Sequence, residues 1–286
     1  AVAGQTADLT PADKKLYGLR DVTATVDSLP LIASSIMSKK IAGGADGIVL
    51  DVKMGDGAFM ENLEGAHRLA EAMVKIGKEL NRKTIAVITD MNQPLGYAVG
   101  NALEVKEAVE TLKGEGPEDL TELCLTIGAN MLVIAEKVAG YEEGYNLLKD
   151  VLESGKALEQ FKRLIISQGG DGNIVEKTTL LPEAVYKFPV ISDQQGYISN
   201  IKTKKLGLLA VEMGAGRAKK GEDIDPAVGI VLEKKVGDFI EKGERLAVIH
   251  VNNDRDKEDI IASFRDVFII RKEKSSLNKL VYEIVS

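Results

Sequence analysis

The sequence predicts an α/β protein in three parts: a helical piece, an α/β domain with a mixed or parallel sheet, and a strand-rich C-terminal α+β domain. Two continuous apolar runs, at 46–52 and 83–91, flank a segment with helical spacing, which indicates a strand, helix, strand unit. Residues 10–45 carry helical signals, and beyond about residue 169 short β-branched runs alternate with glycine turns. We therefore place the helical piece at residues 1–45, the α/β domain, with a helical insert, at 46–190 and the strand-rich domain at 191–286.

Composition narrows the functional class. The 286 residues are 44% hydrophobic and 28% charged, the balance of an ordinary soluble globular protein. The net charge is −7 and no long Lys/Arg block occurs, which argues against a nucleic-acid partner. The single cysteine, Cys124, allows no disulfide framework. No apolar run reaches the length of a membrane span, and the first residues do not resemble a secretory signal. We expect a cytoplasmic protein that binds neither membrane nor nucleic acid.

Capping residues, prolines and glycines mark where the first two predicted helices begin and end. Thr10 and Pro11 suit the N-cap and first position of one helix, while Pro30 and Gly43 suit the start and end of a second. The helix at 61–80 then joins two apolar runs, which indicates neighbouring parallel strands buried on both faces. Ligands collect outside the carboxyl ends of such strands, so residues 51–59 and 89–101 are the expected site region.

Two glycine-rich stretches invite a phosphate interpretation. Gly55 and Gly57 directly follow a strand, but the dinucleotide-binding fingerprint is incomplete, so we favour a tight turn. Residues 214–222 are interpreted as a solvated loop within the strand-rich part. Residues 236–249 have the glycine and apolar spacing of the hairpin in biotinyl and lipoyl carrier domains. The lysine between methionines that carriers modify does not follow, so this likeness is architectural.

The second helix has a possible binding face. At about 100° per residue its apolar stripe contains Leu29, Ile32, Ala33 and Ile36. Ser35 and Lys39 lie one turn apart on the flank. A lysine there commonly packs its stem on the core and extends its ammonium to water. Alternatively, both side chains and Arg20 enter one cleft, where two cations and a hydroxyl would suit an anionic or carbonyl-rich planar ligand.

Other polar residues carry weaker signals. His67 and His250 have no partner at a spacing typical of a nucleophile triad or a zinc site. Glu107 lies early in a predicted helix, where acids usually serve the helix dipole. Its carboxylate could instead hold a hard cation together with the carbonyl groups of Leu95 and Ala98.

Five long blocks resemble the pyrimidine nucleoside phosphorylases, which include the thymidine phosphorylases. These collinear blocks occupy residues 16–40, 51–60, 89–108, 214–220 and 224–238. The resemblance implies a pentosyltransferase of nucleoside salvage, in which inorganic phosphate converts a uridine- or thymidine-type nucleoside to the free base and a pentose 1-phosphate. It also implies a homodimer for the full-length family.

The resemblance implies roles for particular residues. Arg20, Ser35 and Lys39 correspond to the residues that hold the pyrimidine, with Tyr17 near the base. A structural potassium ion would be held by the carbonyl groups of Leu95 and Ala98 and by the carboxylate of Glu107. No organic cofactor is implied, and no residue of this chain is assigned a catalytic role.

One departure from the family pattern concerns phosphate. The glycine-rich "KHSTGG"-like loop and a second serine/threonine segment, which precede the first block in the family, have no counterpart here. We therefore expect roughly the N-terminal third of the family to be absent, so that the chain carries the base-binding part and is inactive alone. Two alternatives stay open: a phosphoribosyltransferase of similar fold, and a noncatalytic binding or carrier module.

Overall fold

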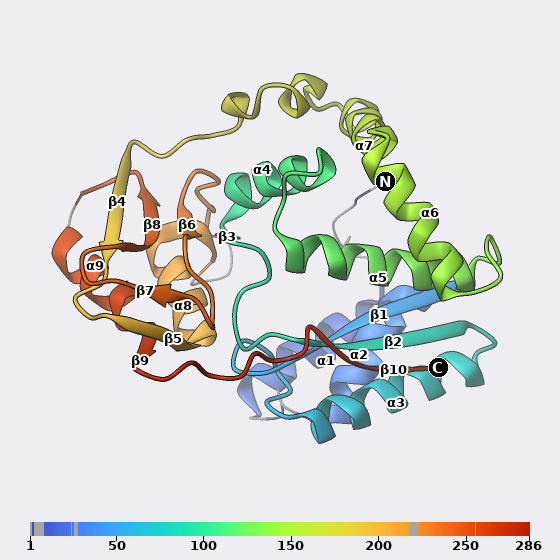
Figure 1. Cartoon of the computed structure of the whole chain (residues 1–286). Coiled ribbons are helices and arrows are strands. Elements are labelled where there is room, and N and C mark those ends of the chain that lie inside the picture. The colour runs from blue at the N-terminus through green and yellow to red at the C-terminus, as the bar shows by residue number, and fades with distance from the viewer. Residues whose placement is uncertain (1, 3–8, 24, 26–27, 218–221, 255) are drawn as a thin grey trace.

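A computed structural model of the chain describes residues 2, 9–23, 25, 28–217, 222–254 and 256–286, with only the backbone for residues 20–22 (Figure 1). The helices are α1 (Pro11–Val22), α2 (Leu29–Ala42), α3 (Leu63–Glu79), α4 (Asn101–Leu112), α5 (Glu118–Ile134), α6 (Tyr141–Glu153), α7 (Lys156–Ser167), η1 (Gly172–Val175), η2 (Thr178–Leu180), α8 (Thr203–Ala210), η3 (Val211–Ala215) and α9 (Lys257–Arg265). The strands are β1 (Gly47–Met54), β2 (Lys83–Asp90), β3 (Ala98–Val99), β4 (Tyr186–Ile191), β5 (Gly196–Ile201), β6 (Gly229–Leu232), β7 (Phe239–Ile240), β8 (Arg245–Val251), β9 (Phe268–Arg271) and β10 (Val281–Val285).

The predicted strand, helix, strand unit is confirmed. β1 and β2 run parallel, from the pair Gly47 and Lys83 to the pair Met54 and Asp90, and α3 connects them. Asn62 caps α3 by accepting a 2.9 Å hydrogen bond from the Gly65 N–H. α3 and α2 cover one side of this sheet and α5 lies on the other side (Figure 1). β10 pairs antiparallel with β2, so the sheet is mixed, in the order β1, β2, β10.

Burial of apolar side chains holds these helices against the sheet. The core residues of α2, α3, β1 and β2 are Ile32, Ala33, Met37, Ile48, Leu50, Val52, Met54, Ala66, Leu69, Ala70, Met73, Val74, Ala86 and Ile88. Each residue is less than a tenth exposed, and removal of this apolar surface from water is the main driving force for the layer. The α2 residues Ile32 and Ala33 come from the apolar stripe identified in the sequence.

The strand-rich part contains two antiparallel sheets. One has the order β3, β6, β8, β4 and the other the order β7, β5, β9. The hairpin expected at residues 236–249 is not found as one paired unit, because β7 pairs with β5 whereas β8 pairs with β6 and β4. This part also contains α8, η3 and α9, and Phe264 of α9 is fully buried in its core. Of the expected loop at 214–222, Gly214 and Ala215 end η3, and residues 218–221 lie outside the described chain.

Sheet pairing connects the predicted domains. β3, at residues 98–99, joins the sheet of the strand-rich part, and β10 returns from that part to β2. β4 spans residues 186–191 and so crosses the expected boundary at 190, although the domain division itself stays a prediction. Among the described helices, none combines the length and the apolar character that crossing a bilayer needs.

Candidate functional site

Ser35 and Lys39 of α2 meet in one polar cluster. The Lys39 Nζ lies 2.7 Å from the Ser35 hydroxyl oxygen and 2.7 Å from the Ser35 carbonyl oxygen. It also forms an ion pair with Asp13 of α1, at 2.6 Å. Ser35 is 7% exposed, while the Lys39 side chain is 32% exposed. The ammonium therefore does not extend alone into water, and it connects α1 to α2.

This arrangement determines which hydrogen-bond donors the cluster can offer to a ligand. An ammonium carries three donors, and here they reach Asp13 and both oxygens of Ser35. Because the Ser35 hydroxyl oxygen accepts from Lys39, its own hydrogen can be donated to another acceptor. Asp13 compensates part of the charge and orients the ammonium. The cluster can thus present one hydroxyl donor and one partly exposed cation to a carbonyl-rich ligand.

The other two predicted base-binding residues lie on α1. Tyr17 is 47% exposed and is one helical turn from Asp13, so the two share a face of α1. Arg20 belongs to the same helix, but its side chain lies outside the described part of the chain. Sequence reasoning missed Asp13, and its one sequence signal is this four-residue spacing from Tyr17.

Glu107 of α4 is held by the turn that precedes β3. Its Oε1 accepts hydrogen bonds from the backbone N–H groups of Tyr97, at 2.8 Å, and Ala98, at 3.0 Å. Its Oε2 lies against Gly96, where a Cβ atom would be 2.2 Å away. Glu107 is 8% exposed, and burial raises its carboxyl pKa, while the two N–H donors favour the charged form.

The predicted cation ligands fit this geometry in part. Tyr97 accepts a hydrogen bond from Leu232 through its carbonyl, so the next residue, Ala98, directs its polar groups away from β6. The Ala98 N–H accordingly bonds to Glu107, and its carbonyl lies on the same outer edge of β3. A carboxylate beside a strand-edge carbonyl offers the oxygen ligands that hard cations prefer.

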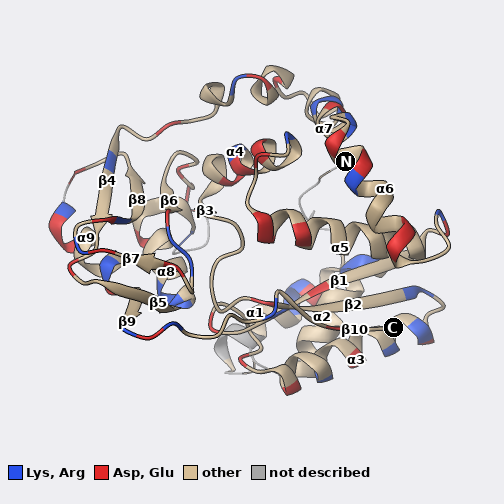
Figure 2. Ribbon diagram, in the orientation of Figure 1, with Lys and Arg blue, Asp and Glu red and all other residues tan. Residues whose placement is uncertain are grey.

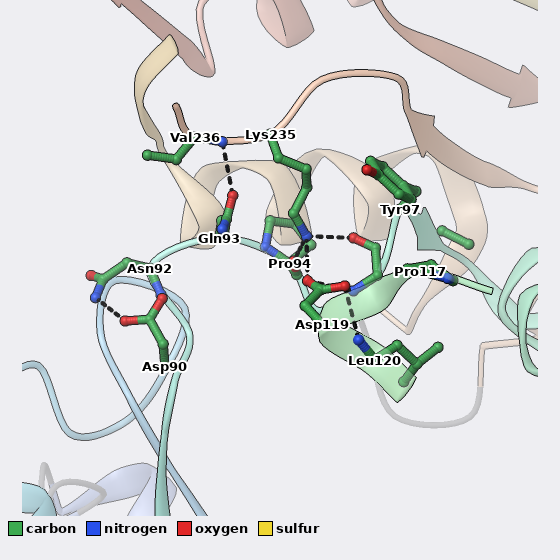
Figure 3. A network of polar contacts seen from close by, with 12 residues as sticks. Asp90, Asn92, Gln93, Pro94, Tyr97, Pro117, Asp119, Leu120, Lys235 and Val236 are labelled. Atoms are coloured by element: carbon green, nitrogen blue, oxygen red, sulfur yellow. Dashed lines mark hydrogen bonds and ion pairs between the residues drawn. The ribbon is translucent and has the colours of Figure 1, made fainter. Parts of the chain in front are cut away.

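A second polar network lies beside this turn and was not found from the sequence. Lys235, which follows β6, reaches the carbonyl oxygens of Pro94 and Gly96 and the carboxylate of Asp119 (Figure 3). Gln93 accepts a hydrogen bond from the Val236 N–H at 2.9 Å. Backbone carbonyl ligands have no residue-type signature, which explains why the sequence did not reveal this network.

The glycine turn after β1 serves packing. Gly55 has φ +127°, and a Cβ there would lie 2.6 Å from the Asn92 side chain, so the tight-turn interpretation holds. Asp56 accepts a 3.0 Å hydrogen bond from the Lys204 N–H of α8. A cavity of about 970 Å³ opens beside this turn, and its α2 lining consists of Ile32, Ile36 and Lys40 rather than Ser35 or Lys39.

The two histidines occupy different surroundings. His67 lies 2.9 Å from Glu283 of β10 and 3.3 Å from Glu71, and the hydrogen bond to Glu283 raises its pKa. His250 is half-buried in β8, where burial lowers its pKa. Within the described ranges, no group of three or more His, Cys, Asp or Glu side chains could hold a metal ion.

Two family profiles define the class of this α/β protein. Residues 1–158 match the profile described as "Glycosyl transferase family, a/b domain", and residues 197–271 match "Pyrimidine nucleoside phosphorylase C-terminal domain". Since the first match covers more than half of the 286 residues, the chain belongs to this glycosyl transferase family. The second match confirms the resemblance to the pyrimidine nucleoside phosphorylases.

Two curated relatives align with the whole chain, and a third aligns with most of it. It is 54% identical over 286 residues to the pyrimidine-nucleoside phosphorylase of Bacillus subtilis (strain 168) and 52% identical to that of Geobacillus stearothermophilus. Both alignments cover 100% of this chain and 66% of the relative. The Staphylococcus aureus (strain USA300) enzyme is 56% identical over 261 residues, 91% of this chain and 60% of the relative. The chain thus spans 60% to 66% of the length of these relatives.

Proposed function

We propose that the chain is the base-binding part of a pyrimidine-nucleoside phosphorylase, a pentosyltransferase of nucleoside salvage. The cluster of Ser35, Lys39 and Asp13 is the observation that carries this proposal, because it offers a cation and a hydroxyl donor to one ligand. The relatives' printed names support the activity, and the two family matches support the class.

The reaction explains the need for a cation at the base. A phosphate oxygen attacks the anomeric carbon of the nucleoside, and the glycosidic bond breaks. Its electron pair passes to the ring nitrogen and spreads onto the base carbonyl oxygens, so negative charge grows on the pyrimidine. A cation already in place stabilises this charge more in the transition state than in the substrate, which lowers the barrier.

Each base-binding residue then has a distinct contribution. Lys39 donates to a base oxygen in place of the Ser35 carbonyl oxygen, while Asp13 fixes the ammonium position. Ser35 donates its hydroxyl hydrogen to the base, since its oxygen already accepts from Lys39. Arg20 adds a second cation and Tyr17 flanks the ring, as the family resemblance implies.

A potassium ion is part of the same proposal. The carbonyl groups of Leu95 and Ala98 and the Glu107 carboxylate would hold it, and its role would be to steady the turn between the two parts of the chain. No organic cofactor is proposed. The thermal midpoint of the 286-residue chain should rise in potassium chloride relative to lithium chloride, and this difference should disappear in Glu107→Gln. An equal response of both proteins would argue against the site.

The substrates, partners and place of action are likewise proposed. The substrates are a pyrimidine nucleoside and inorganic phosphate, the full-length protein is a homodimer, and the location is the cytoplasm. A phosphoribosyltransferase has no observation in its favour beyond similarity of fold. The likeness of residues 236–249 to carrier-domain hairpins is proposed as one of sequence spacing only, because β7 and β8 belong to different sheets.

Titration calorimetry with uracil tests the proposal. Lys39→Met should weaken uracil binding roughly 10- to 100-fold, the loss expected for one hydrogen bond to a charged group. Lys40→Met is the matched control, because Lys40 is the next residue of α2 and is exposed on another face. Equal affinity of the two variants would contradict a role for Lys39 at the base.

A further inference from the structure

Hydrogen bonds within the strand-rich part hold the Lys235 backbone in place, and the side chain extends out of that part. Lys235 begins a tight turn after β6, and its N–H donates to the Asp238 carboxylate at 2.8 Å. The Asp238 N–H returns a 3.1 Å hydrogen bond to the Lys235 carbonyl, and Gly237 donates to the Ile198 carbonyl of β5 at 2.8 Å. The side chain therefore extends from a rigid base.

At the far end of the side chain, oxygen atoms surround the Lys235 ammonium. The Nζ atom donates to the carbonyl of Pro94, to the carbonyl of Gly96 at 2.6 Å, and to Asp119 of α5 at 2.9 Å (Figure 3). The Tyr97 ring centroid lies 5.4 Å away, within the range of a cation–π interaction. All three ammonium donors thus have acceptors, and Lys235 is 9% exposed.

The backbone around the ammonium directs oxygen atoms toward it. Gly96 adopts φ +65°, its N–H donates to Asp119 at 3.2 Å, and its carbonyl points to Lys235. Two neutral carbonyl oxygens and one carboxylate carry one negative charge in total, which a single monovalent cation balances, and backbone carbonyl oxygens are the ligands of potassium in channel filters. Figure 2 shows acidic residues gathered at the start of α5, which deepens the negative potential there.

The position is reachable from solvent. A cavity of about 580 Å³ is lined by Asp119, Tyr97 and Lys235, and by Glu118 and Glu122 of α5. A small ammonium ion or alkylammonium ion could therefore enter if the lysine side chain were removed. This site uses other contacts than the predicted cation site: Glu107 lies where a Gly96 side chain would begin, whereas Lys235 contacts the Gly96 carbonyl.

We propose that Pro94, Gly96 and Asp119 form a monovalent-cation site that the chain fills with its own Lys235 ammonium. The lysine thereby connects the strand-rich part to the turn between β2 and β3. This inference is independent of the proposed activity, because it concerns only the affinity of the turn for a cation. Removal of the ammonium leaves the partly buried Asp119 carboxylate without its ion-pair partner and the two carbonyl groups without this donor, which is costly unless another cation replaces it.

Chemical rescue of Lys235→Ala tests this inference by thermal unfolding of the full chain, followed by circular dichroism. We expect its midpoint to lie roughly 5 to 10 °C below that of the unsubstituted chain. Ammonium or methylammonium chloride should restore the midpoint in a saturable way, and tetramethylammonium chloride at equal ionic strength should not. The control is Lys234→Ala, whose lysine lies 3.3 Å from the Phe239 carbonyl and whose midpoint should respond equally to all salts. An equal salt response of both variants would overturn the proposal.

A second measurement applies if Lys235→Ala does not fold. Asp119→Asn keeps the shape of the acid but removes its charge, so the Lys235 ammonium is held less tightly. Hydrogen exchange of the peptide covering residues 91–99 should then become at least roughly 10-fold faster than in the unsubstituted chain, as for the loss of one charged hydrogen bond. Unchanged exchange in Asp119→Asn would contradict the site, whatever the outcome of uracil binding.

Discussion

Substitution of Gly96 by alanine should destabilise the chain far more than the same change at Gly114. Gly96 has φ +65° and Gly114 has φ +84°, so alanine experiences left-handed strain at both positions. At Gly114 an added Cβ meets no heavy atom within 4 Å. At Gly96 it would lie 2.2 Å from the Glu107 Oε2, closer than two such atoms can approach.

The structure sets the size of the difference. Left-handed strain alone costs about 1 to 2 kcal/mol, and this is the whole loss expected for Gly114→Ala. In Gly96→Ala the buried Glu107 carboxylate must also move, which weakens its hydrogen bonds from Tyr97 and Ala98. A hydrogen bond to a charged group contributes about 1.5 to 3 kcal/mol, so the total loss should be about 3 to 5 kcal/mol.

Urea unfolding of both variants measures this difference. The free energies of unfolding, extrapolated to water, should differ by about 2 kcal/mol or more, with Gly96→Ala the less stable. Similar losses in the two variants would show that Glu107 is not packed against Gly96, and the account of the turn would be refuted.

Three further predictions concern the core, the C-terminal strand and turnover. Phe264→Ala should cost about 3 to 5 kcal/mol of unfolding free energy, because Phe264 is fully buried. The exposed Phe59→Ala should cost less than about 0.5 kcal/mol, and equal losses in urea unfolding would contradict the burial. Since Glu283 raises the His67 pKa, the interaction should stabilise the fold fully below the usual histidine pKa of about 6.5 and be lost as pH rises through the raised value. The urea midpoint of the unsubstituted chain should therefore exceed that of His67→Gln at low pH only, and a pH-independent difference would count against it. Finally, the 286-residue chain should release no uracil from uridine and phosphate, because the family's phosphate-binding motifs do not occur in its sequence. Sustained uracil release would contradict this expectation.

Local patterns predicted the parts of the fold that depend on neighbouring residues. The runs at 46–52 and 83–91 became β1 and β2, because continuous apolar runs joined by a helix are typical of parallel strands buried on both faces. The contact of Ser35 with Lys39 also followed from spacing, since residues four apart on a helix are neighbours.

Contacts between distant segments were not predictable in this way. Lys235 and Pro94 are separated by 141 positions, and a carbonyl ligand leaves no trace in residue type. The pairing of β10 with β2 and the separation of β7 from β8 likewise depend on how the two parts of the chain meet. Asp13 was missed because its partner, Lys39, lies on another helix, 26 positions away.

A crystal structure of the chain with bound uracil tests the central proposal most directly. We expect uracil carbonyl oxygens at hydrogen-bond distance, about 2.7 to 3.2 Å, from the Ser35 hydroxyl and the Lys39 ammonium. Uracil bound instead in the cavity beside Val52, Gly57 and Ile36 would contradict that proposal.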